Sequence, residues 1–199
     1  MTSRRLALAA LLAGTTVATL GTGCSPRAPA FNGVDITGAS YARDFALNDS
    51  AGKRRTLAEF RGKLVVVFFG FAQCPDVCPS TLADLAQVKK RLGADGDRMQ
   101  VIFITVDPER DSPQVLASYV PAFDPSFIGL TGSPEEIAAA AREFKVFFQK
   151  VAGKTETSYT IDHTAGAYVF DREGRVRLFI RHGTAAEAIT ADLQGLLRG

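Results

Sequence analysis

The sequence predicts one α/β domain in which helices flank a central, mostly parallel β-sheet. Two runs, residues 63–69 (KLVVVFF) and 100–106 (QVIFITV), are apolar and β-branched without polar alternation. Such runs are typical of strands buried on both faces, as in a parallel sheet. Helical patterns separate the candidate strands, as the crossover connections of parallel neighbours require.

The other elements are expected in sequence order. A short hairpin over residues 42–57 precedes the first buried strand, and apolar residues recur at helical spacing over 82–92. Pro113 favours the first turn of a helix after the second buried strand. A short strand is expected over residues 127–130.

The last third of the chain predicts a helix, a hairpin and a final helix. Residues 133–136 (SPEE) form a capping box that starts an alanine-rich helix. Residues 159–170 and 176–180 predict a terminal antiparallel hairpin around the turn at 171–174. Residues 184–187 are expected to cap the last helix. After the first hairpin, the predicted order is β-α-β-α-β-α-β-β-α.

Composition excludes several classes of protein. The 199 residues are 46% hydrophobic, which suits one folded domain and excludes a disordered chain. The net charge of +2 comes from Arg4 and Arg5, because the other 21 basic residues balance the 21 acidic ones. No basic field is available for nucleic acid. Three cysteines are too few for a disulfide-stapled miniprotein.

The first residues are typical of a secretory signal. Arg4 and Arg5 precede an uncharged run over 6–20 that is too short for a membrane span. Residues 20–25 (LGTGCS) resemble a bacterial lipoprotein cleavage box in which Cys24 is lipidated. We expect a signal peptide over 1–24, a flexible tether over 25–40 and the domain over 41–199, membrane-anchored and facing the periplasm. Plain secretion and an uncleaved anchor are the alternatives.

Two cysteines lie between the first buried strand and the next helix, in the sequence Cys74-Pro-Asp-Val-Cys78-Pro. In open α/β sheets, sites form at the carboxyl ends of strands, where this loop falls. Four-residue spacing at a helix start could close a disulfide between Cys74 and Cys78 or bind one soft ion. Pro79 in the first turn would place Cys78 at the positive end of the helix dipole, which predicts a lowered thiol pKa. A purely structural disulfide here would close a very small loop and stabilise little.

Three motifs resemble those of the Sco/SenC family, extracytoplasmic copper proteins required for cytochrome oxidase assembly. They are residues 69–79 (FGFAQCPDVCP), 105–111 (TVDPERD) and 159–164 (YTIDHT). The resemblance covers the chain from about residue 45 to the C-terminus. It implies a thioredoxin-like fold and one copper, as Cu(I) or Cu(II), bound by Cys74, Cys78 and His163. Two thiolates and an imidazole form the kind of soft ligand set that suits copper.

Neighbouring residues have two interpretations each. Asp107 ends the second buried strand and could serve copper transfer or hold the loop, or it could simply cap a turn. Asp76 could tune the thiols or face a partner. His163 is expected at the start of a strand, after a loop over 152–158 that could swing it; the alternative is a buried, hydrogen-bonded histidine. His182 is expected to lie on the surface.

The resemblance implies a copper chaperone that delivers copper to the binuclear site of cytochrome c oxidase, with the copper-accepting subunit and other copper carriers as partners. Such a carrier needs no turnover and is not an enzyme in the ordinary sense. A thiol–disulfide reductase that keeps the acceptor cysteines reduced is the alternative. A structural zinc site would need four ligands, and only three are visible. The lone peroxidatic cysteine of a peroxidase is absent.

Overall fold

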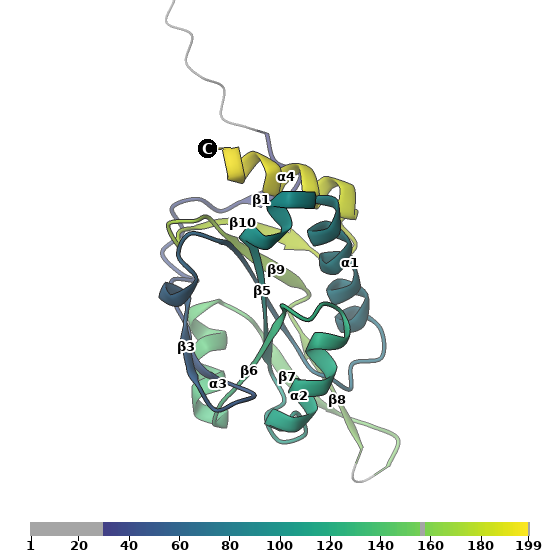
Figure 1. Cartoon of the computed structure of the whole chain (residues 1–199). Helices are drawn as coiled ribbons and strands as arrows, with labels where there is room; N and C mark the ends of the chain where they lie inside the picture. The colour runs from purple at the N-terminus through teal and green to yellow at the C-terminus, as the bar shows by residue number, and fades with distance from the viewer. Residues whose placement is uncertain (1–29, 156–157, 199) are drawn as a thin grey trace, which may run out of the picture.

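The computed structural model describes residues 30–155 and 158–198 and shows a large β-sheet flanked by helices (Figure 1). Its central strands are β4 (Leu64–Gly70), β5 (Met99–Thr105) and β6 (Ile128–Thr131), which pair in parallel. Every residue of β4 and β5 is buried, as the apolar runs predicted. The α/β class is therefore confirmed, with parallel pairing at the centre of the sheet.

Antiparallel strands extend the sheet on both sides in the order β1-β10-β9-β4-β5-β6-β2-β3. On one side are β9 (Gly166–Phe170), β10 (Val176–Arg181) and β1 (Val34–Asp35). On the other side are β2 (Ala46–Asp49) and β3 (Arg54–Thr56). The predicted hairpins around residues 49–54 and 171–174 both form.

The helices are α1 (Val77–Arg91), α2 (Pro113–Tyr119), α3 (Pro134–Glu143) and α4 (Ala186–Arg198). Short 3-10 helices are η1 (Leu57–Phe60), η2 (Gly93–Arg98) and η3 (Val120–Ala122). The predicted capping box is present: Ser133 Oγ accepts the Glu136 amide at 3.2 Å, and Glu136 Oε2 accepts the Ser133 amide at 2.9 Å. Within the described part of the chain, no helix has the length and apolar character needed to cross a bilayer.

The expected single strand over 159–170 is wrong, because that stretch forms two strands in different sheets. β8 (Tyr159–His163) pairs with a strand that the sequence did not predict, β7 (Phe148–Ala152), while β9 pairs within the large sheet. All five residues of β9 are buried, whereas only Ile161 is buried in β8. The sequence pattern over 159–170 thus did not reveal the change from an exposed hairpin to a core strand.

The expected tether over 25–40 ends too late, because the segment from Asn32 onward is packed against the domain. Val34 pairs with Phe179 of β10. The buried carboxylate of Asp192 accepts the backbone amides of Asn32 and Gly33 at 2.9 and 2.8 Å, and the Asn32 side-chain amide at 2.9 Å. The expected signal peptide over 1–24, with Cys24, lies outside the described residues, as do residues 25–29.

Replacing Asp192 with alanine should lower the free energy of unfolding by about 1–3 kcal/mol, because the donors of Asn32 and Gly33 lose their acceptor. Urea unfolding would measure the loss. Asp97→Ala, at an exposed position, is the matched control and should change stability by no more than about 0.5 kcal/mol. Equal effects from both substitutions would show that the contact does not stabilise the domain.

Candidate metal site

The two thiols lie where β4 ends and α1 begins. We call residues 71–78 the dithiol loop; it follows Gly70 and runs into the first turn of α1. Cys74 is half-buried and its amide donates to the Phe71 carbonyl at 3.2 Å. Cys78 is fully buried, and its backbone amide lies 3.4 Å from the Cys74 sulfur. Both cysteines are free thiols in the structure.

His163 reaches the thiols from the end of β8, not from the start of a strand as expected. Its Nε2 lies 3.6 Å from the Cys78 sulfur, and the ligand atoms of Cys74, Cys78 and His163 all lie within 4.8 Å of one another. His163 Nδ1 is 3.1 Å from the Thr164 carbonyl, which can only accept. The proton therefore belongs on Nδ1, and the lone pair of Nε2 is directed to the thiols.

Two aromatic rings hold the imidazole in apolar surroundings. The rings of Phe68 and Phe71 meet the His163 ring edge-on, with centroids 6.2 and 5.9 Å away. Burial is the main cause that lowers the pKa of His163 below its ordinary value. A neutral imidazole is the form that binds metal, so this environment favours the ligand form.

The expected lowering of the Cys78 pKa is wrong. Burial is the largest influence and raises the pKa of the Cys78 thiol well above that of an exposed cysteine. The amide at the helix N-terminus is directed to the sulfur of Cys74 instead. Cys74 is therefore the more accessible thiol of the pair, and the Cys78 thiol would have to release its proton in order to bind a metal ion.

The donor atoms fit a soft metal ion. Two sulfurs and one imidazole nitrogen suit copper, whereas a closed structural zinc site takes four protein ligands. In the described ranges, no further histidine, cysteine or carboxylate joins this cluster. The site is partly open to solvent through Cys74 and His163, which are both half-buried.

Asp107 connects the loop after β5 to the hairpin that carries His163. Its buried carboxylate accepts the Tyr159 hydroxyl at 2.8 Å and the Nε of Arg110. The helix that follows is capped by Ser112, which accepts the Val115 amide at 3.3 Å. Asp107 thus contacts the hairpin that carries His163, and its side chain does not cap α2.

The other candidates lie at the surface. Asp76 is exposed at the start of α1 and makes no capping hydrogen bond. Asp162, next to His163, is exposed as strand alternation predicts. His182 is exposed just beyond β10, with its Nδ1 3.1 Å from the hydroxyl of Thr81. None of these three side chains belongs to the thiol–imidazole cluster.

Two residues that support the site were not among those predicted from the sequence. A Cβ atom added to Gly70 would lie 2.7 Å from the Cys78 sulfur and 2.9 Å from Phe103, so glycine is required there. The buried carboxylate of Asp111 accepts the Thr105 hydroxyl at 2.6 Å and the Ala72 amide at 2.9 Å, tying β5 to the dithiol loop. Burial raises the pKa of Asp111. Both residues stand inside the quoted motifs, which was the available signal.

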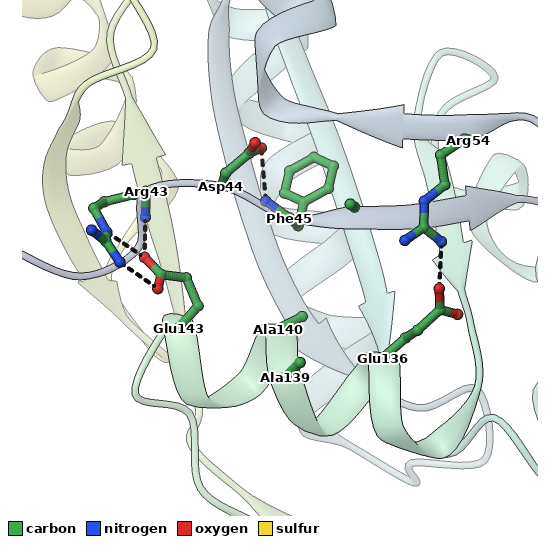
Figure 2. A pocket seen from close by; sticks show the side chains of 9 residues that line it. Arg43, Asp44, Phe45, Arg54, Glu136, Ala139, Ala140 and Glu143 are labelled. Atoms are coloured by element: carbon green, nitrogen blue, oxygen red, sulfur yellow. Dashed lines mark hydrogen bonds and ion pairs between the residues drawn. The ribbon is translucent and has the colours of Figure 1, made fainter.

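A surface depression of about 480 Å³ lies elsewhere, beside α3 (Figure 2). Two ion pairs line it: Arg43 Nε binds Glu143 at 2.9 Å, and Arg54 binds Glu136 at 2.7 Å. The Asp44 carboxylate accepts the backbone amides of Phe45 and Leu57. The depression therefore presents satisfied charges and contains none of the three candidate ligands.

This α/β domain presents two thiols and an imidazole at the carboxyl ends of its parallel strands. It falls in the class of thioredoxin-like proteins with a site that could hold a soft metal ion. The chain belongs to the SCO1/SenC family, whose model matches residues 34–198. The resemblance noted in the motifs is thereby confirmed.

Relatives and solved structures agree with this membership. The mitochondrial SCO2 homolog of Mus musculus is 39% identical over 153 residues, covering 76% of this chain and 60% of that protein. The copper-bound structure of Bradyrhizobium japonicum ScoI is 40% identical, with TM-score 0.70, covering 77% of this chain and 97% of that chain. Apo Sco1 from Thermus thermophilus is 43% identical, with TM-score 0.75, covering 84% and 97%.

Gly70→Ala should displace the Cys78 sulfur and lower the free energy of unfolding by about 1–3 kcal/mol, because the added methyl group overpacks the end of β4. Gly129→Ala is the control, since its Cβ would crowd Val120 and Leu116 at 3.0 and 3.1 Å. Urea unfolding of both variants, in a Cys24→Ser background, would measure the loss of stability from overpacking. Thiol titration of the same variants would measure the displacement of the Cys78 sulfur. Unchanged Cys78 reactivity in Gly70→Ala would contradict the predicted displacement.

The lowered pKa of His163 predicts a loss of stability in acid. The unfolded chain binds the proton first, near the ordinary value of 6.5, so the folded state is penalised as the pH falls below it. In the metal-free reduced chain, the difference in free energy of unfolding between wild type and His163→Gln should be constant above pH 6.5. As the pH falls below 6.5, wild type should lose stability relative to His163→Gln. The slope should be at most about 1.4 kcal/mol per pH unit. A difference that is flat down to pH 5 would refute the assignment.

Proposed function

We propose that this chain is a copper carrier that binds one copper ion through Cys74, Cys78 and His163. The observation that carries the proposal is the approach of His163 Nε2 to the buried thiol of Cys78, 85 residues away in sequence, at 3.6 Å. A dithiol that served only in thiol–disulfide exchange would not need an imidazole beside it. The B. japonicum relative, at 40% identity, is described with copper bound.

The geometry suits uptake and release of the cargo. Two thiolates and a neutral imidazole form a soft set that accepts Cu(I) and can also hold Cu(II). Because burial keeps Cys78 protonated, copper binding must release its proton, and affinity should therefore rise with pH. The half-exposed Cys74 and His163 leave one side of the ion open to the ligands of an acceptor.

We further propose the acceptor and the compartment. Copper would pass to the binuclear copper site of cytochrome c oxidase, or to other copper carriers, outside the cytoplasm. Residues 1–24 would serve as the signal for export, and Cys24 would be lipidated. The basic residues and the uncharged run of this segment support the proposal. The protein would act at the membrane surface, facing the periplasm.

A thiol–disulfide reductase remains the second candidate. Cys74 is the accessible thiol, and the amide of Cys78 lies beside its sulfur, an arrangement that favours attack by Cys74. That activity would need neither His163 nor copper. The two functions are therefore separable by one side chain.

Anaerobic titration of the reduced chain with Cu(I) against a chromophoric chelator, in a Cys24→Ser background, tests the proposal. Wild type should bind one copper, and His163→Ala should weaken binding about tenfold or more, since a lost ligand is worth at least about 1.4 kcal/mol. His182→Ala replaces the other of the two histidines and should bind as wild type does. Weak binding that ignores His163, with a readily re-formed disulfide, would instead favour the reductase.

A further inference from the structure

The strand that carries His163 has few contacts with the body of the domain. β7 and β8 form a separate two-stranded sheet, which we call the His hairpin. Every residue of β7 except the half-buried Phe148 is exposed, and Ile161 is the single buried residue of β8. Apolar packing against the core is confined to Ile161, Phe148 and Tyr159, so specific polar contacts have a large share in fixing the hairpin relative to the thiols.

One guanidinium touches both the His hairpin and the dithiol loop. The Cζ of Arg110 lies 3.6 Å from the centroid of the Tyr159 ring, and its Nη1 donates to the Tyr159 carbonyl at 2.9 Å. The same Nη1 lies 3.2 Å from Gln73 Oε1, one residue before Cys74. Cζ is also 5.8 Å from the centroid of Phe71, whose ring meets His163.

The guanidinium is itself held by a buried carboxylate. Its Nε is paired with the carboxylate of Asp107, whose side chain is fully buried and also accepts the Tyr159 hydroxyl. Beside it, Lys150 of the hairpin pairs with Glu109 at 2.6 Å. The loop over residues 107–110 thus holds β7 and β8 through charge-assisted bonds and through the stacking of Arg110 on Tyr159. Tyr159 is four residues before His163 in the same strand.

We propose that Arg110 is a positioning residue that sets the distance between His163 and the two thiols by bridging the His hairpin to the dithiol loop. This inference rests on the proposed copper function. Arg110 is not a ligand and acts only through His163. Its planar fork reaches Tyr159, Gln73 and Asp107 at once, which the single ammonium of lysine cannot do.

A thermodynamic cycle separates this role from a simple effect of charge on the thiolates. The full chain, in a Cys24→Ser background, would be titrated with Cu(I) as wild type, Arg110→Ala, His163→Ala and the double variant. Arg110→Ala should weaken binding about tenfold when His163 is present and change it less than about twofold when His163 is absent. Arg110→Lys keeps the charge and should resemble Arg110→Ala. Equal weakening in both backgrounds, or full rescue by lysine, would overturn the proposal.

A second variant guards against misfolding, because Arg110→Ala leaves the buried Asp107 carboxylate without its cation. Tyr159→Ala removes the stacked ring and keeps the Arg110–Asp107 pair, so it should weaken copper binding in the same His163-dependent way. Loss that persists without His163 would overturn the assignment. Arg98→Ala, which removes an exposed pair with Asp95, is the control and should leave affinity unchanged.

Amide hydrogen exchange of the metal-free reduced chain tests the bridge without copper. Arg110→Ala and Tyr159→Ala should accelerate exchange in β8 about tenfold or more and leave β4 and β5 protected. Unchanged exchange in β8 would overturn the proposal. If wild type bound no copper, the proposed function would fail while accelerated exchange in β8 would still establish the bridge, so the two failures are distinguishable.

Discussion

The site depends on the close packing of the Cys78 sulfur against the end of β4. The sulfur occupies the space that a side chain at position 70 would fill, so α1 can begin directly over the strand. That placement sets the first helical turn, and with it the amide that lies beside Cys74. Asp111 secures the same loop from β5 by accepting the Ala72 amide. The thiols are therefore held by the rigid centre of the sheet, where packing tolerates little change.

The third candidate ligand is held quite differently. His163 lies on an exposed two-stranded sheet that is fixed by an ion pair, a stacked ring and a few hydrogen bonds. Such contacts open at a lower free-energy cost than a buried core strand. The domain thus combines two sulfurs held by the buried sheet with a nitrogen held mainly by polar contacts at the surface. In the copper carrier proposed above, this unequal rigidity would help the site to bind its cargo and then release it.

Local sequence patterns predicted the parts of the fold that local physics determines. The buried strands, the capping box at Ser133 and the hairpin at 171–174 follow from periodicity and turn chemistry. The division of 159–170 between two sheets depends on what lies across each strand, which no local pattern records. Likewise, a helix dipole lowers the pKa of a thiol at an exposed helix start, but at Cys78 burial outweighs the dipole and raises the pKa. The motifs identified the three candidate ligands, but not the roles of Gly70 and Arg110.

The hydrogen bonds from the Asn32 and Gly33 amides to Asp192 have a consequence for where the first described residues lie relative to the candidate metal site. They fix the point at which the preceding chain reaches the domain, beside α4 at the top of Figure 1. The dithiol loop lies at the opposite end of α1, whose 15 residues span about 22 Å. Asn32 and Gly33 are therefore held near one end of α1, while the candidate metal site lies at the other end, with Cys74 and His163 half-exposed and Cys78 buried. The first described residues thus enter the fold at the pole of the domain that lies away from its candidate metal site.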